Sequence, residues 1–259
     1  MRLWQKILLV TASLLCASTS STVIYAKTYP AYVERPLRFV RPMITMNAGA
    51  MYTSPGRSQI FPLIDSGNYI YTNTTSRQVK PIFGGFAGAE FLLPPSAALQ
   101  LGIGFYQASP LTVSGVLAQS ADPQSFDYFQ YAYRILSRQL VFEGKLLTTF
   151  QRRVHPYVSA GIGSSANRVK DYQIGYPPFL TFTPMFTDHM NYSLSYNAGL
   201  GVDFSLNKNF RLGFGYRFAD FGHVNAGTGT IDNTPIGPTL MQSHLYTNQI
   251  IGQFSYIFD

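Results

Sequence analysis

The stretch Asn191–Asn207, NYSLSYNAGLGVDFSLN, decides the fold class. From Tyr192 to Leu206, apolar or aromatic side chains alternate with small or polar ones without interruption. A period of two residues places the two sets on opposite faces of a β-strand, whereas a helix would scatter them around its circumference. At about 3.3 Å per residue, such a strand is long enough to cross a bilayer while tilted.

Seven further segments show the same alternation, so the sequence predicts eight strands. One face of each segment is apolar, with aromatic residues near the ends, and the other carries Gly, Ser, Gln and charged side chains. The seven segments are Pro42–Tyr52, Val79–Leu92, Ala97–Ala108, Tyr128–Leu147, Val154–Ser165, Phe210–Asp220 and Ser243–Phe258.

The links between these strands alternate in length along the whole chain. Short links follow the second, fourth and sixth strands, at Pro94–Ser96, Thr148–Arg153 and Asn207–Asn209. Long links follow the first, third, fifth and seventh, at about Thr53–Gln78, Ser109–Asp127, Ala166–Met190 and Phe221–Gln242. Barrels of the bacterial outer membrane have short periplasmic turns and long extracellular loops. The sequence therefore predicts an all-β, eight-stranded antiparallel up-and-down transmembrane barrel.

Composition favours the same fold class. Charged residues make up 12% of the chain and aromatic residues 15%, whereas soluble domains have about 25% charged residues. After the N-terminal segment, no run approaches the roughly 20 apolar residues of a membrane helix. The net charge of +7 is spread along the chain rather than gathered in a basic stripe. We therefore expect no nucleic-acid partner.

The N-terminal segment has the pattern of a secretory signal peptide. Arg2 and Lys6 precede a short apolar run, and small and polar residues follow it. We place cleavage after Ala26, which gives a signal peptide over residues 1–26, an N-terminal extension over 27–41 and a barrel over 42–259. Cys16, the single cysteine, lies in the segment to be removed. Disulfides and thiolate metal sites are then excluded from the mature chain.

Two segments carry a resemblance to a known family. The stretch GFGYRFADFG (Gly213–Gly222) and the last strand SHLYTNQIIGQFSYIF (Ser243–Phe258) resemble the OmpA-type and OmpW-like outer-membrane β-barrels of Gram-negative bacteria. The resemblance covers the chain from about Pro42 and implies a location in the outer membrane. It also implies that the barrel-assembly machinery reads a closing strand rich in aromatic residues. The alternate residues Phe254, Tyr256 and Phe258 are the candidates for this assembly signal, although Asp259 follows the usual terminal aromatic.

An eight-stranded barrel has an interior just wide enough for side chains. The inward face of the predicted strands carries charges of both signs, and a low-dielectric interior favours their pairing. We therefore predict a lumen filled by side chains, with a narrow pore as the alternative. The predicted lumen charges are Glu90, Glu143, Lys145, Asp203, Arg211 and Arg217.

Two arginines fall on the outward face of the fourth strand, toward its extracellular end. Arg134 and Arg138 would there contact the phosphates of lipopolysaccharide, since the guanidinium fork suits such oxyanions. The third long link also carries an apolar run, YPPFLTFTPMF at Tyr176–Phe186. We expect this run to pack against the other loops, with contact to lipid, a ligand or a host partner as the alternatives.

Catalytic patterns are weak. Ser243 and His244 are neighbours, and neighbours on a regular strand point to opposite faces. His223 near Asp220 would supply a base and its orienting acid, but the sequence places no nucleophile beside them. We predict no catalytic residue, no cofactor and no metal site.

The sequence thus predicts a monomeric, non-enzymatic outer-membrane barrel that is structural or surface-interacting through its extracellular loops. Its expected partners are outer-membrane lipid, lipopolysaccharide, the barrel-assembly machinery and a host or surface ligand. The alternative is a narrow channel or a small hydrophobic-ligand transport barrel of the OmpW kind. A lipid A-modifying enzyme and a soluble lipocalin-like binder are further alternatives. A lipocalin would place its apolar face inward, which periodicity by itself does not decide.

Overall fold

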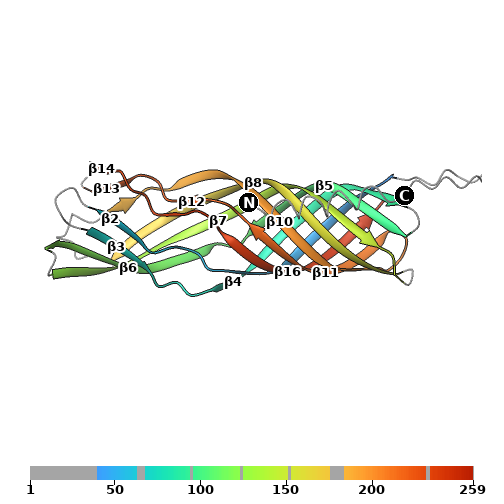
Figure 1. The fold of residues 1–259 in the computed structure, drawn as a ribbon, viewed down its shortest axis with the longest axis horizontal. Helices are drawn as coiled ribbons and strands as arrows, with labels where there is room; N and C mark the ends of the chain where they lie inside the picture. The colour runs from blue at the N-terminus through green and yellow to red at the C-terminus, as the bar shows by residue number, and fades with distance from the viewer. Residues whose placement is uncertain are drawn as a thin grey trace, which may run out of the picture. The chain divides into compact units, whose positions relative to one another are not determined.

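The computed structural model describes residues 40–62, 68–93, 96–122, 125–150, 153–175, 184–231 and 234–258. The predicted signal peptide and most of the predicted extension lie outside these ranges. The described residues form sixteen strands (Figure 1). Among them there is no helix that is long and apolar enough to cross a membrane.

Eight of the strands close into a ring. Each pairs with its neighbours in antiparallel register, and the ring closes where β1 pairs with β16 and where β7 pairs with β8. The prediction of an eight-stranded up-and-down barrel is confirmed. The ring strands are β1 (Val40–Thr53), β4 (Gln78–Leu93), β5 (Ala97–Ala108), β7 (Ser125–Thr148), β8 (Val154–Gly175), β10 (His189–Ser205), β11 (Phe210–Asp220) and β16 (Tyr246–Ile257).

Several strand bounds differ from the predicted ones. β1 begins at Val40, two residues before the predicted strand start at Pro42. β8 continues to Gly175, ten residues beyond the predicted end, because it stays paired with β7 there. β16 begins at Tyr246 rather than Ser243.

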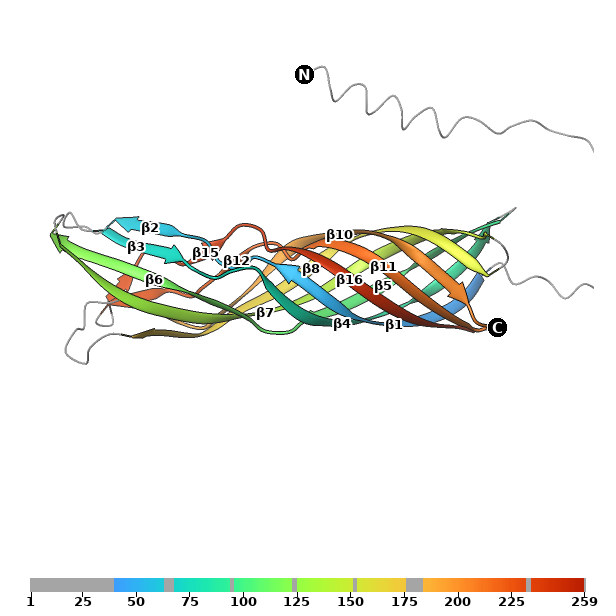
Figure 2. The same cartoon turned by 90° about the horizontal axis from the view of Figure 1, so that it is seen from below.

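The short links gather at one end of the barrel, which we call the turn end, together with the last strand's C-terminal residues (Figure 2). The opposite end, which we call the loop end, carries the long links, and these contain further strands. A strand crosses a bilayer with about 9–11 residues, whereas β7 has 24 and β8 has 22. Both strands therefore continue beyond the ring at the loop end.

Three additional strands extend the wall at the loop end in the order β2, β3, β6, β7. β6 pairs with the part of β7 that β5 does not reach, and Ser109 and Pro110 separate β5 from β6. The remaining short strands form small sheets within the third and fourth long links. The additional strands are β2 (Gln59–Pro62), β3 (Asn68–Asn73), β6 (Leu111–Asp122), β9 (Met185–Phe186), β12 (Val224–Asn225), β13 (Gly229–Ile231), β14 (Thr234–Ile236) and β15 (Met241–Gln242).

The apolar faces of the ring strands point outward. On β10, Leu194 is 70% exposed and Leu200 is 59% exposed, while Ser195 and Asp203 between and after them are buried. The same division holds on β7, where Phe142 is exposed and Glu143 is buried. This arrangement is the reverse of a lipocalin, so the lipocalin alternative is wrong.

Candidate functional site

The six predicted lumen charges all lie inside the ring and are buried, each 7% exposed or less. They come from four strands, β4, β7, β10 and β11, and the alternation of side chains along each strand turns them inward. The structure divides them into three clusters along the lumen, each with its own hydrogen-bonding partners.

The Glu90 cluster lies toward the turn end. Nη1 of Arg211 donates to Oε2 of Glu90 at 2.7 Å, and Nε2 of Gln100 donates to the same oxygen at 2.8 Å. Arg41 donates to the other carboxylate oxygen. Two guanidinium groups thus face one carboxylate that has no exposure to solvent. The sequence prediction missed Arg41, because the two prolines of residues 27–41 hide the start of the alternation.

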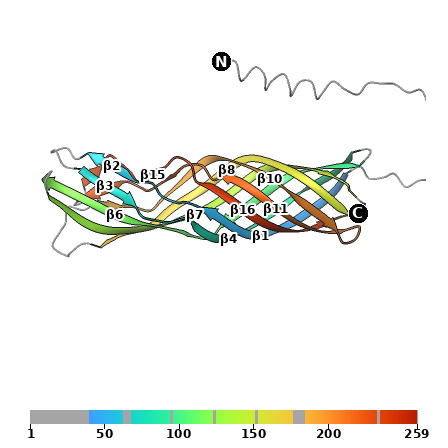
Figure 3. The ribbon, with the colours of Figure 1, turned by 60° about the horizontal axis from the view of Figure 1, so that its bottom comes forward.

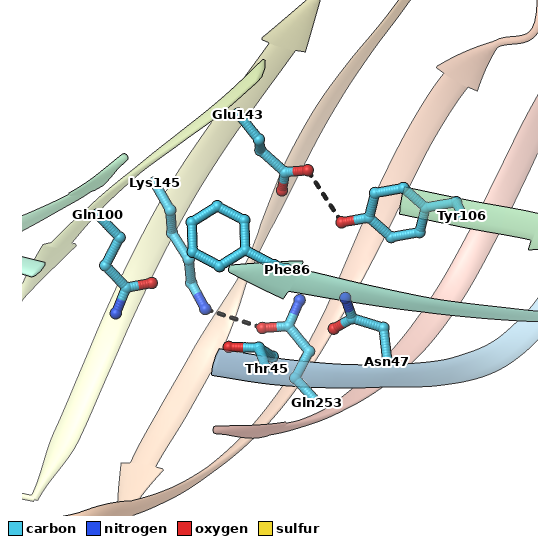
Figure 4. Close-up of a pocket in the computed structure, with 8 residues that line it drawn as sticks. All are labelled: Thr45, Asn47, Phe86, Gln100, Tyr106, Glu143, Lys145 and Gln253. Carbon is cyan, nitrogen blue, oxygen red and sulfur yellow. Dashed lines mark hydrogen bonds between the residues drawn. The ribbon is translucent and has the colours of Figure 1, made fainter. Parts of the chain in front are cut away.

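The Lys145 cluster spans the lumen from β7 to β10 and β16. Nζ of Lys145 donates to Oε1 of Gln253 at 2.8 Å (Figure 4). It also donates to Oδ2 of Asp203 at 2.7 Å. The same ammonium group lies 3.8 Å from the ring centre of Tyr157, within the range of a cation–π contact. One carboxylate, one amide oxygen and one aromatic face therefore surround the ammonium group of this buried lysine.

The Arg217 cluster lies closer to the loop end. Cζ of Arg217 stacks 3.8 Å from the ring centre of Tyr106. The Tyr106 hydroxyl donates to Oε2 of Glu143 at 2.9 Å (Figure 4). Arg217 also donates to Oε1 of Gln249 at 2.9 Å and to Oε1 of Gln139 at 2.5 Å. Inward parity of the strands predicts each of these glutamines, but not which arginine they meet.

Two aromatic rings fill the space that inward glycines leave. A Cβ atom on Gly215 would lie 2.2 Å from the Tyr157 hydroxyl, and one on Gly84 would lie 2.5 Å from Cδ1 of Tyr106. Both contacts are far too short for real atoms, so these positions accept only glycine unless the rings move. The cavity lined by Phe86, Gln100, Tyr106 and their neighbours has a volume of about 20 Å³, which is the space of roughly one water molecule.

Toward the loop end, the inward face becomes apolar. The inward side chains of β7 are mostly polar near the turn end, where they include Lys145, Glu143 and Gln139. Toward the loop end the inward side chains are apolar or aromatic and buried, namely Ile135, Tyr133, Tyr131 and Phe129. The prediction of a polar inward face over the whole strand is therefore wrong at this end. Since β7 leaves the ring here, segments of the long links enclose its inner face, and apolar burial becomes favourable as in a soluble core.

We call the aromatic part of this core the aromatic cap. Its ring centres lie 5.1–5.4 Å apart at the contacts of Tyr71 with Phe61 and Tyr131, and of Tyr172 with Phe186. Phe186, from the apolar run of the third long link, is only 6% exposed, whereas its neighbour Met185 is 39% exposed. Residues 176–183 of that run lie outside the described ranges. The aromatic cap consists of Phe61, Tyr69, Tyr71, Tyr131, Tyr133, Tyr172 and Phe186.

The family model for the outer membrane protein beta-barrel domain matches residues 48–258. The chain belongs to this family. The turn end of the barrel is accordingly periplasmic and the loop end extracellular, as the lengths of the links predict. The match covers the aromatic cap and the three lumen clusters except Arg41.

Solved structures of outer-membrane proteins are similar to the chain at low sequence identity. OprG from Pseudomonas aeruginosa is 12% identical with a TM-score of 0.46, over 83% of this chain and 95% of its own. The Escherichia coli outer membrane protease OmpT is 9% identical with a TM-score of 0.44, over 85% and 96%. Neisserial surface protein A is 12% identical with a TM-score of 0.41, over 83% and 96%. No curated protein sequence matches the chain.

Arg134 and Arg138 are exposed on the outward face of β7, as alternation predicts. Arg134 is already paired: its Nη2 lies 2.5 Å from Oδ2 of Asp171, a residue with a φ of 56°. The neighbouring Arg168 lies 3.0 Å from Oδ2 of Asp188. No ion pair involves Arg138 within the part of the chain that the structure describes. Phosphate contact by this pair of arginines stays a prediction, and Arg138 is the freer of the two.

The histidine that meets Asp220 is His244, not His223. Nδ1 of His244 lies 2.7 Å from Oδ2 of Asp220, and the other oxygen of this buried carboxylate accepts the amide of Gly222 at 2.7 Å. His223 instead offers its carbonyl oxygen to Asn191 at 2.6 Å. The two partners are 24 residues apart in sequence, and only the pairing of β11 with β16 brings them together. Within the described ranges, no group of three or more His, Cys, Asp or Glu side chains forms a metal site.

The aromatics of the closing strand lie on its outward face at the periplasmic end. Phe254 is 43% exposed and Phe258 is 41% exposed, while Ser255 and Ile257 point inward and are buried. The ring of Tyr256 contacts Phe258 edge-on at 4.7 Å and Phe210 at 5.0 Å. These residues are thus placed to meet lipid at the interface. Their reading by the assembly machinery stays a prediction.

Proposed function

We propose that this chain is a non-enzymatic outer-membrane protein whose barrel is closed by its own side chains and which acts through its extracellular surface. The observation that carries the proposal is the filled lumen. Three clusters of paired charges occupy the ring, the cavity beside them holds about 20 Å³, and an aromatic cap lies above them. We further propose that the chain reaches the outer membrane by means of a signal peptide cleaved after Ala26.

The extracellular wall supports a surface role. β2, β3, β6 and the distal part of β7 form a sheet beyond the ring, and the aromatic cap packs against its inner face. A loop that only connects two strands needs no such sheet, because two to five residues suffice for a hairpin. The sheet instead presents a fixed surface to the exterior, on which we place the contact with a host or surface ligand.

Single-channel recording in planar bilayers tests the closed lumen. We expect the purified, refolded barrel to give no steady openings. Removing the cap contact by Phe186→Ala should also leave the bilayer silent, because the charge clusters below the cap still fill the ring. Steady openings of the unmodified barrel would reject the proposal.

A narrow channel is the second candidate, and one observation favours it. Several buried polar atoms of the lumen lack a protein partner, including both side-chain polar atoms of Asn197 and Oδ1 of Asn47. Buried polar groups of this kind commonly bind water, and a file of water would conduct protons or small ions. In the same recordings, openings that disappear in Asn197→Leu would select this candidate.

A further inference from the structure

A groove lies on the barrel at the extracellular end of the seam between β1 and β16. The two strands are paired from Met43 with Ile257 up to Thr53 with Thr247, and they separate beyond that point (Figure 3). The separation leaves a groove of about 470 Å³, within the range of small-molecule sites. This seam groove is lined by Tyr52, Thr53, Ser54, Gly56, Arg57, Arg77, Gln242, Ser243, His244, Tyr246 and Asn248.

One wall of the seam groove is the segment Ser54–Arg57, which directly follows β1. Gly56 has a φ of +82°, a left-handed backbone conformation that favours glycine. The amide of Gly56 donates to Oε1 of Gln242 at 2.8 Å, and Nδ2 of Asn73 donates to the carbonyl oxygen of Pro55 at 3.1 Å. This segment is thus held by hydrogen bonds to Gln242 and Asn73, and the backbone of Arg57 lies beside the groove.

The opposite wall is the segment Gln242–Tyr246, which is also fixed. Nε2 of Gln242 donates to the carbonyl oxygen of His244 at 2.9 Å. The imidazole of His244 is held by the carboxylate of Asp220 at 2.7 Å and stacks on Tyr246 with 5.2 Å between ring centres. Half of the His244 side chain remains exposed. Its ring is therefore oriented before any ligand binds.

The groove spans the boundary between lipid and headgroups. Tyr246 and Asn248 lie on the outward face of β16, directly above the lipid-facing Ile250, and Tyr52 lies across the seam on β1. Tyrosines at this level mark the membrane interface. Arg57 and Arg77 lie beyond the ends of the paired strands, on the extracellular side. The groove thus has an aromatic floor at the interface and a basic rim above it.

The side chains that line the groove favour a negatively charged ligand. Its lining contains two arginines and one histidine, with no acidic side chain among the described residues. Within the described ranges, no carboxylate pairs with Arg57 or Arg77, whereas Arg134 and Arg168 on the other side of the barrel pair with Asp171 and Asp188. Guanidinium groups bind phosphate oxygens with two parallel hydrogen bonds, and two unpaired guanidinium groups at one groove suit a phosphate monoester.

We propose that the seam groove binds the phosphorylated sugar headgroup of an outer-leaflet glycolipid. Arg57 and Arg77 hold the phosphate, His244 contributes a fixed polar contact, and Tyr52 and Tyr246 contact the sugar at the interface. The site lies outside the lumen, so it goes beyond the closed-barrel function. It requires only that the protein resides in the outer membrane, and a conducting lumen would leave it unaffected.

The test is native mass spectrometry of the full mature chain in lipid nanodiscs. The discs contain either lipid A with both phosphates or lipid A from which the phosphates have been removed. The test variant is R57Q/R77Q, and the matched control is R153Q/K208Q, which removes two exposed charges at the periplasmic turns. A heat-dependent shift in gel mobility verifies that each variant is folded.

We expect the unmodified protein to retain phosphorylated lipid A and to bind the dephosphorylated form about tenfold or more weakly, since each lost charged hydrogen bond is worth a factor of this order. R57Q/R77Q should lower the affinity for the phosphorylated form by a similar factor, and R153Q/K208Q should leave it unchanged. Equal retention of both lipids, or an equal loss in the control variant, would overturn the proposal. So would displacement of the lipid by millimolar inorganic phosphate, because the groove would then be a general anion site.

Discussion

At the scale of single residues, we expect substitution of Glu90 to destabilise the lumen strongly. Its carboxylate receives hydrogen bonds from Arg41, Gln100 and Arg211 and is completely buried. In Glu90→Gln the buried Arg211 and the partly buried Arg41 would lose their counter-charge. We expect the free energy of unfolding to fall by about 3 kcal/mol, measured by urea-induced unfolding in lipid vesicles.

Glu143→Gln is the matched control for this prediction. The amide that replaces Glu143 still accepts the Tyr106 hydroxyl, and Arg217 keeps its bonds to Gln139 and Gln249. The loss of stability should therefore be clearly smaller than for Glu90→Gln. Equal losses in the two variants would show that the lumen responds to total charge rather than to the contacts of each cluster.

Arg134 and Arg138 differ in their partners, so their substitutions should differ in effect. Arg134 is held by Asp171, whereas Arg138 has no ion pair among the described residues. We expect Arg138→Gln to lower the affinity for phosphorylated lipid A several-fold and Arg134→Gln to lower it less. If the two surfaces bind separate lipids, Arg138→Gln combined with R57Q/R77Q should lower the number of bound lipids further than either variant. Unchanged binding in both variants would remove lipopolysaccharide contact from this surface.

At the scale of elements, the closing strand β16 decides whether the ring forms. The amide of Phe258 donates to the carbonyl oxygen of Pro42 at 2.9 Å, which ties the end of the strand to the start of β1. Deleting residues 258–259 removes this bond and the edge-on contact of Phe258 with Tyr256. We expect that deletion to slow membrane insertion markedly in a reconstituted assembly assay.

Deletion of Asp259 alone is the control for the closing strand. It leaves Phe258 and all its contacts in place, so insertion should proceed at the normal rate. If both truncated chains inserted normally, the three aromatics of β16 would serve only as lipid-facing contacts, and the proposed assembly signal would be wrong.

At the scale of the whole molecule, the aromatic cap makes the extracellular end sensitive to alkaline pH. Burial raises the pKa of Tyr131 to about 12, from an ordinary value of about 10. Burial also raises the pKa of Tyr71, and the charges of Tyr172, Tyr69 and Tyr131 raise it further. Because the folded state holds the proton more tightly, the stabilisation is fully present below pH 10 and is lost as the pH rises through about 12.

A spectrophotometric titration of tyrosinate measures this effect. The cap tyrosines should ionise only above their ordinary pKa of about 10, together with a loss of the extracellular fold. Tyr131→Phe should reduce the amplitude of this high-pH step. A single step near pH 10 would show that the cap is open to water.

The sequence by itself determined the ring. Strict alternation from Tyr192 to Leu206 and in the seven other segments identifies the strands, because a strand with lipid on one side and a filled lumen on the other must alternate at every residue. The same parity identifies the inward position of all six lumen charges and the outward position of Arg134, Arg138 and the closing aromatics. These are properties of single strands, so local pattern contains them.

Tertiary structure decided which of these side chains meet. The pairs Glu90 with Arg211, Lys145 with Asp203 and Asp220 with His244 join residues 121, 58 and 24 positions apart. Strand register and the closure of the ring bring these pairs together, and the alternation along a single strand carries no information about register or closure. The aromatic cap and the seam groove arise where β7 outgrows the ring and where β1 and β16 separate. Both features depend on where along the barrel each strand pairing ends, and these positions are defined only in the assembled sheet.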